Sequence, residues 1–200
     1  PENLKGYLSI RSFLAYGLPV GGLKSNINFT GNISYNQTPE KINGVLNYAK
    51  APTFGLGVVF SSNISEKVDF TLSSNTSFSN VTNTTQTLND NQFINQSTWL
   101  KLNLIFDYGL VFRSTVNHTL TTGLNDGFNQ NFVLWNMELG KKLIEEKAEI
   151  KLTIFDLLRQ NQNISRTING SFIEDSETQI ITQYFMLSFV FNIRSFKQGT

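Results

Sequence analysis

The chain has 200 residues, with 16 Lys and Arg against 15 Asp and Glu and a net charge of +1. This balance offers no basic surface to a polyanion, which argues against nucleic acid as a partner. Charged residues make up only 16% of the chain, below the roughly 25% of ordinary soluble domains. Asparagine, Ser and Thr fill the polar share, and there is no cysteine. Disulfides, thiolate metal sites and Cys nucleophiles are therefore excluded.

Strict alternation of apolar and polar side chains is the main pattern in the chain. From Leu23 to Tyr35 the apolar residues occupy odd positions and polar ones the even positions. This period indicates a strand with one apolar and one polar face. With a first strand over Tyr7–Tyr16, the pattern predicts nine strands. The other seven lie around Phe54–Phe60, Val68–Phe78, Leu100–Phe106, Phe112–Leu120, Val133–Leu139, Ile150–Ile154 and Phe185–Ile193.

The lengths of the strands and connections favour a transmembrane β-barrel. Most strands are long enough to cross a bilayer at a tilt, which takes about 9–11 residues. Short and long connections also alternate, as they do between the periplasmic and extracellular ends of such barrels. The short ones are Gly17–Gly22, Asn63–Lys67, Asp107–Gly109 and Lys142–Lys147, and the long ones are Asn36–Ala51, Asn80–Ser97, Thr122–Gln130 and Leu158–Thr178.

The alternation also predicts which side chains face lipid and which face the barrel interior, because a strand cannot mix the two without a bulge. Tyr and Trp residues, Tyr48 and Trp99 among them, are expected mostly at strand ends or in loops, where aromatic girdles form. The predicted lipid-facing residues are Ile27, Phe29, Ile33, Leu102, Leu104, Phe189 and Phe191. The predicted interior residues are Asn26, Asn28, Thr30, Lys101, Asn103, Ser188 and Asn192.

Two further features are expected near the outer rim. The segment Phe155–Asn161 breaks the alternation with adjacent leucines, which indicates a bulge or a helical turn. Asn169-Gly170 is a strong hairpin signal, and it is flanked by Ile164–Thr167 and Ser171–Glu174. The second segment is therefore predicted to form a two-stranded projection outside the membrane.

The C-terminal third resembles the end of a TonB-dependent-receptor-like outer-membrane barrel of Gram-negative bacteria. The stretches that carry the resemblance are Gly123–Lys142, Glu149–Asn161 and Tyr184–Arg194, and it extends back through Arg11–Pro19 to nearly the whole chain. It implies a 22-stranded barrel with an N-terminal plug and energy-coupled import of a ligand. Residues 1–200 would then be a single barrel segment, the C-terminal part of an all-β, antiparallel, up-and-down barrel, without the plug.

The resemblance also implies the partners and the location. These are outer-membrane lipid, the rest of the barrel and the plug, the TonB energy-coupling system and a surface lipoprotein, all at the bacterial outer membrane. The function expected is that of a barrel component with a lipid-facing wall and a polar lumen for ligand uptake. The alternative is a soluble or secreted all-β binding module that uses its Asn- and Thr-rich loops.

No residues suggest catalysis, a cofactor or a metal site. The lone histidine, His118, has no cysteine or acidic cluster at metal-ligand spacing, so it is interpreted as a histidine near the rim. Without a second histidine or paired carboxylates in a cleft, we expect no enzyme activity. The candidate functional residues are charged side chains on the polar faces of the strands, which are expected to line the lumen: Arg11, Lys101, Arg113, Glu138 and Arg194.

Overall fold

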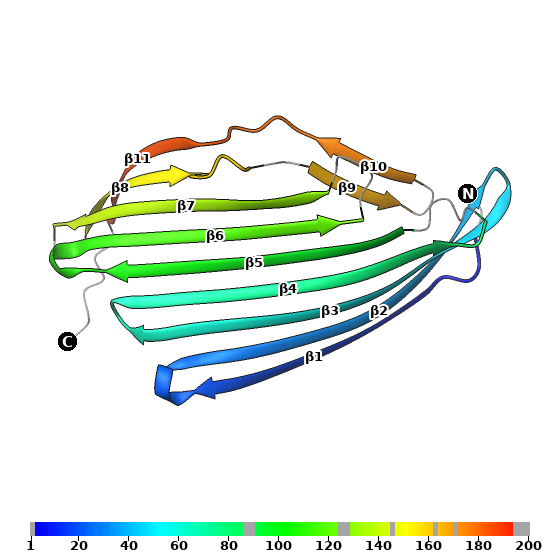
Figure 1. Ribbon diagram of the computed structural model, residues 1–200, viewed down its shortest axis with the longest axis horizontal. Coiled ribbons are helices and arrows are strands. Elements are labelled where there is room, and N and C mark those ends of the chain that lie inside the picture. The colour runs from blue at the N-terminus through cyan, green and yellow to red at the C-terminus, as the bar shows by residue number, and fades with distance from the viewer. Residues whose placement is uncertain are drawn as a thin grey trace.

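The computed structural model describes residues 3–85, 91–123, 129–144, 147–161, 164–169 and 172–193. Nine long strands form one antiparallel sheet in the order β1-β2-β3-β4-β5-β6-β7-β8-β11 (Figure 1). The predicted nine-stranded, up-and-down, all-β arrangement is confirmed. The strands are β1 (Leu8–Val20), β2 (Ser25–Ile42), β3 (Val45–Ser65), β4 (Val68–Asn83), β5 (Asn91–Ile105), β6 (Leu110–Thr122), β7 (Gln130–Leu143), β8 (Ala148–Phe155) and β11 (Tyr184–Phe191).

A separate two-stranded sheet pairs β9 (Ile164–Asn169) with β10 (Phe172–Glu177). Asn169 is opposite Phe172 in this pairing, so the predicted hairpin is present with slightly different bounds. Gly170, the second residue of the predicted Asn169-Gly170 turn, lies outside the described residues, as does Ser171. Two single-turn 3₁₀ helices, η1 (Gly21–Leu23) and η3 (Asp107–Gly109), occupy predicted short connections.

The register places the apolar stripes of neighbouring strands on one shared face. Ile27 is opposite Phe60, which is opposite Leu72, and Leu72 is opposite Leu100. Because side chains alternate along each strand, the polar residues of the same strands share the other face. Phe60 and Phe70 meet edge to face on the apolar side, with ring centroids 5.4 Å apart. The sheet therefore has one apolar and one polar face, as the alternation predicts.

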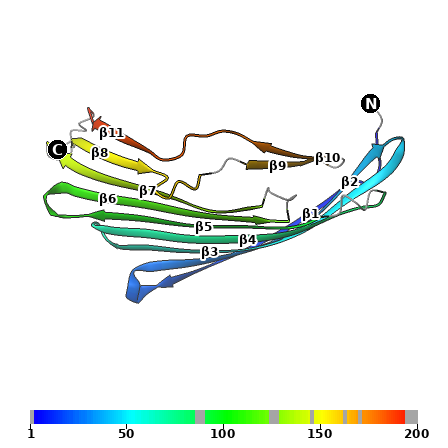
Figure 2. The same cartoon turned by 45° about the horizontal axis from the view of Figure 1, so that its top comes forward.

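The sheet is a single curved wall whose strands slant across it (Figure 2). β1 and β11 are at the two ends of the strand order, and each pairs with only one strand among the described residues. The core of a globular domain is missing, since only Val111 and Ala148 are buried apolar side chains in the described part of the chain. Most apolar side chains are exposed on one face, where they need another apolar phase to cover them.

One predicted loop is wrong. The segment Asn36–Ala51 continues β2 and β3 as a long hairpin that extends beyond the rest of the sheet (Figure 1). Its turn is Asn43-Gly44, and both residues have positive φ, 51° and 81°. An Asn-Gly pair tolerates these angles, so it favours a tight two-residue turn. The polar composition around it concealed this local signal.

Several strand ends also lie further out than the apolar alternation predicts. β1 runs on to Val20, and β4 and β5 reach Asn83 and Asn91, so the loops Gly17–Gly22 and Asn80–Ser97 are shorter than expected. Trp99 therefore lies inside β5 instead of at its end, and Tyr48 lies inside β3, in the long hairpin with β2. The reason is that backbone pairing needs no apolar side chain, so the ladder continues where the alternation stops.

The irregular segment after β8 forms a turn held by Asp156. The Arg159 N–H donates to the Asp156 carbonyl at 3.0 Å, and both residues have positive φ. The buried Asp156 carboxylate accepts the N–H groups of Gln160 and Asn161, each at 3.0 Å. The segment predicted to form a bulge or a helical turn thus forms a turn that is not helical, and it ends β8 at Phe155.

Among the described residues, no helix has the length and apolarity needed to cross a membrane.

Candidate functional site

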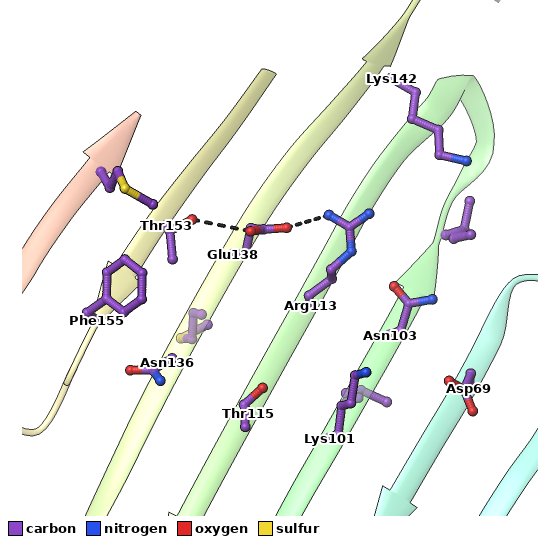
Figure 3. Close-up of a pocket in the computed structure, with 14 residues that line it drawn as sticks. Asp69, Lys101, Asn103, Arg113, Thr115, Asn136, Glu138, Lys142, Thr153 and Phe155 are labelled. Carbon is purple, nitrogen blue, oxygen red and sulfur yellow. Dashed lines mark hydrogen bonds and ion pairs between the residues drawn. The ribbon is translucent and has the colours of Figure 1, made fainter. Parts of the chain in front are cut away.

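The polar face of the sheet is hollowed near the short-turn end of β5 to β8. The hollow has a volume of about 520 Å³. One row of directly opposed residues crosses it on six neighbouring strands (Figure 3). The row consists of Asp69, Asn103, Arg113, Glu138, Thr153 and Met186.

An ion-pair network lies at the centre of this row. The Arg113 guanidinium pairs with the carboxylates of Glu138, on the next strand, and of Glu149, at 2.8 Å on the strand beyond. Glu138 also accepts a hydrogen bond from the Thr153 hydroxyl at 3.3 Å and is 3.4 Å from the Lys151 ammonium. The four charged side chains are 18% to 36% exposed, so water screens them less than it screens fully exposed pairs.

The network can cross β7 because residue 140 is glycine. Gly140 is opposite Lys151 and lies between β6 and β8 in the register. A Cβ atom at this position would approach the Glu149 Oε1 to 2.5 Å and the Arg113 Nη1 to 3.6 Å. Any side chain there would therefore displace the carboxylate from Arg113, so Gly140 leaves open the space through which the two residues meet.

Three of the five candidate residues come together at this hollow. Lys101, Arg113 and Glu138 all line it, in β5, β6 and β7. Arg11 is in β1, opposite Ser34, and so lies on the same polar face but away from the hollow. Arg194 lies outside the described residues.

Glu149 and Lys151 were not among the candidate residues, although the structure places both in the network. They alternate with Ile150 and Leu152, so the same period-2 pattern that marks the apolar stripe assigns them to the polar face. Their charges alone gave no reason to select them. What was missing is the register, which brings β8 into contact with Arg113 across β7.

Two groups at the hollow have capacity left for a further contact. Within the described residues, the Lys101 ammonium has no ion-pair partner, whereas Arg113 has two. The Asn103 side-chain oxygen is buried and accepts no hydrogen bond from the described residues. Figure 3 shows the side chains of Lys101 and Asn103 neighbouring each other on the same wall.

A second hollow on the polar face lies further along β4 to β6, with a volume of about 390 Å³. Its lining is formed mainly by amides and hydroxyls, and no charged residue is among it. The lining residues on this face are Thr30, Asn32, Asn75, Ser77, Asn95, Ser97, Thr119 and Thr121. The polar face is thus hydrophilic along much of its length, with its charges concentrated at one end.

Nothing in the described part of the chain forms a metal cluster of three or more His, Cys, Asp or Glu residues. His118 is in β6, and its Nε2 is 2.9 Å from the Asn131 Oδ1. It is opposite Thr98 and Val133, on the apolar face and away from the ion-pair network. The histidine therefore takes no part in the charged hollow.

The chain was compared with known protein families and proteins. A family model described as "Outer membrane protein beta-barrel family" matches residues 15–191. Neither a curated protein nor a solved structure matches the chain significantly. The match covers the second half of β1, all of β2 to β10, and β11 to its last residue.

Proposed function

Because this chain belongs to the outer membrane protein β-barrel family and is located in the bacterial outer membrane, we propose that it forms part of the wall of a TonB-dependent-type receptor. In this proposal the apolar face contacts lipid and the polar face lines a lumen through which a ligand is taken up. The chain does not act as an enzyme.

The observation that carries the proposal is the difference between the two faces of the sheet. The apolar face exposes large side chains such as Phe54, Leu56 and Leu187, which lipid would cover at little cost. The opposite face contains two hollows lined by charged and polar groups, which need water or a polar ligand. A wall of this kind suits a hydrated lumen and does not suit the soluble binding module considered as the alternative.

The resemblance supports the energy-coupled part of the proposal. It extends over nearly the whole chain and concerns receptors in which a coupling box and a plug precede the barrel. The partners proposed on this basis are the plug, the remaining strands, TonB and a surface lipoprotein. Lys101 and Arg11 are the proposed lumen cations with no ion pair inside the described chain, and Lys101 is the better placed to contact a ligand or the plug.

The proposal is tested on the full-length parent protein. We expect the purified periplasmic domain of TonB to bind the parent saturably in detergent, while a parent from which the proposed coupling box is deleted, as the matched control, does not bind. In planar bilayers with KCl, the plugged parent should show no steady conductance. A parent that conducts steadily and does not bind TonB would be a passive channel, and the energy-coupled proposal would then be rejected.

A further inference from the structure

The second hollow on the polar face, here called the neutral hollow, is built from two adjacent rows of residues on β2 to β6. In each row, five residues are directly opposed on five neighbouring strands. One row consists of Asn32, Gly55, Ser77, Asn95 and Thr121, and the other consists of Thr30, Gly57, Asn75, Ser97 and Thr119. Apart from the two glycines, every residue of both rows carries a hydroxyl or an amide, and all eight line the hollow. The neutral hollow is therefore a continuous surface of uncharged polar groups.

Most of these polar groups have no hydrogen-bond partner in the described part of the chain. Asn75 donates to the Ser73 hydroxyl at 3.1 Å, whereas the side chains of the other seven form no hydrogen bond with the described residues. In the charged hollow, by contrast, Arg113 and Glu138 are paired with each other. The neutral hollow thus presents donors and acceptors that are open to water or to a ligand, and bound water can exchange for ligand groups.

Two glycines on β3 let polar side chains of both neighbouring strands lie over that strand. A Cβ atom at Gly55 would be 2.3 Å from the Asn32 Oδ1. At Gly57, a Cβ atom would be 2.3 Å from the Asn75 Oδ1 and 2.5 Å from the Thr30 Oγ1. A glycine inside a strand often marks a close approach to its backbone. The glycines therefore let these groups converge on one space of about 390 Å³, within the range of small-molecule sites, about 300–1,000 Å³.

Aromatic side chains border the neutral hollow on β5. Phe93 and Trp99 flank Asn95 and Ser97 with a period of two along this strand, so all four side chains are on the polar face. Both rings are partly buried, and the Trp99 indole N–H has no hydrogen-bond acceptor among the described residues. A ring on this face offers a flat apolar surface beside the hydrogen-bonding groups of the hollow.

We propose that the neutral hollow binds an uncharged saccharide. A sugar ring has hydroxyls around its edge, each of which donates and accepts, and C–H groups on its faces. The hydroxyls match the open amides and hydroxyls of the hollow, and the C–H faces match the aromatic rings beside it. The lining carries no charge that could compensate an ionic ligand for its lost hydration, so the ligand is neutral. This inference rests on the lumen of the proposed function but not on its energy coupling.

Equilibrium binding to the full-length parent tests the proposal. The protein is purified in lauryldimethylamine oxide, a detergent without a sugar head group, and is titrated calorimetrically with maltotriose, cellotriose and laminaritriose. We expect saturable binding of at least one trisaccharide, with a Kd of about 1 mM or lower. Acetyl-trialanine amide, an uncharged peptide, represents the competing ligand class and should not bind. Absence of saturable binding by all three trisaccharides would overturn the proposal, as would equal affinity for the peptide.

Removal of hydrogen-bonding groups shows whether the trisaccharide binds at this hollow. Asn95→Ala with Ser97→Ala should weaken binding about tenfold, the combined effect of losing two hydrogen bonds of ordinary strength. Asn26→Ala is the matched control, because Asn26 is also on the polar face, in β2, but lies outside both hollows. The control should bind as the parent does. An unchanged affinity in the double variant, or an equal loss in the control, would overturn the proposal.

Trp99→Leu is the second variant, which decides if the double variant does not fold. Heat-modifiability on a gel checks the folding of each variant. Trp99→Leu should weaken binding by about fivefold, since the flat ring is lost while the hydrogen-bonding groups remain. An unchanged affinity in this folded variant would also overturn the proposal.

The TonB measurement separates this inference from the proposed function. A parent that binds TonB but no trisaccharide contradicts only the saccharide site. A parent that binds a trisaccharide but not TonB contradicts only the energy-coupled uptake.

Discussion

Arg113 shows how a single residue links three strands of the wall. Its guanidinium contacts Glu138 on β7 and Glu149 on β8, and Gly140 leaves the space between them open. Removal of the arginine would take away the cation that the partly buried Glu138 and Glu149 share and leave Glu138 with Lys151, at 3.4 Å. Removal of Arg113 and Glu138 together leaves one carboxylate fewer without this cation. The energy of the network is therefore best measured as a coupling.

We expect Arg113→Met to lower the free energy of unfolding of the full-length protein by about 1–3 kcal/mol. Glu138→Gln alone should cost less, because Arg113 keeps Glu149. The double variant should lose less stability than the sum of the losses in the two single variants. The difference is a positive coupling energy, which a double-mutant cycle of urea unfolding in lipid vesicles measures. Strictly additive effects of the two substitutions would show that the observed ion pair adds nothing to stability.

Asp107 and Lys67 form an ion pair that is much more exposed. Asp107 lies in the short turn between β5 and β6, and Lys67 lies in the short turn between β3 and β4. The Lys67 Nζ is 2.6 Å from the Asp107 Oδ1. The hydrogen bond from Lys67 and its positive charge lower the pKa of the Asp107 carboxyl below its ordinary value of 3.8. Since the folded-state pKa is the lower one, the stabilisation is complete above the unfolded-state pKa. It is lost as the pH falls through the folded-state pKa.

We therefore expect a small loss of stability between about pH 4 and the lower folded-state pKa of Asp107, which Asp107→Asn removes. The effect should shrink in high salt, because both side chains are largely exposed and salt screens such pairs. Thermal unfolding of the parent and of Asp107→Asn at pH 3 and pH 7 measures the difference. If the pH dependence of stability were the same in both proteins, it would come from other carboxyl groups and the prediction for Asp107 would be wrong.

In β11, the neighbouring residues Ser188 and Phe189 lie on opposite faces of the sheet. Phe189 is opposite Ile150 and is 63% exposed, while Ser188 is opposite Lys151 on the face of the ion-pair network. A lysine at position 189 would place a charge on the lipid face, at a cost of about 2–4 kcal/mol near the bilayer midplane. The register adds a detail that alternation alone does not supply, because a lysine at 188 would lie directly opposite Lys151.

We expect Phe189→Lys to impair membrane assembly of the full-length protein. Ser188→Lys, on the polar face, should be tolerated with a small loss, since like charges directly opposed destabilise a sheet. Ser188→Glu, which faces the Lys151 cation, should be tolerated better than Ser188→Lys. The fraction of heat-modifiable, folded protein in outer-membrane preparations ranks the three variants. Equal assembly of Phe189→Lys and Ser188→Glu would show that the two faces of β11 are assigned wrongly.

For the whole molecule, the decisive feature is the pair of sheet edges at β1 and β11. In the part of the chain that the structure describes, each edge presents unpaired backbone N–H and C=O groups, which cannot remain open in hydrocarbon. The expected 22-stranded barrel supplies the neighbours of both edges. A nine-stranded closure is not expected, because single-chain bacterial barrels have an even number of strands.

Residues 1–200 alone should therefore fail to give a heat-modifiable barrel in detergent or vesicles. The same segment should assemble when the remaining strands of the parent are supplied, either in one chain or by co-expression. The measurement is gel mobility before and after heating, together with protease protection. A folded, membrane-inserted barrel made by these residues alone would contradict the larger barrel.

The sequence by itself determined the faces and the number of strands. Side chains alternate with a period of two along any strand, so the assignment of Ile27 or Lys101 to a face needs no knowledge of the neighbours. Candidate lumen residues could be selected in this way, and three of the five line the charged hollow. The turn at Asn43-Gly44 could also have been predicted from the local sequence, although the prediction overlooked it.

Only the tertiary structure decided which residues meet across strands. Alternation tells which face a side chain occupies, but the register between strands tells its partner, and register depends on pairing over long separations in the chain. Arg113 reaches Glu149, 36 residues away, because β6, β7 and β8 align around Gly140.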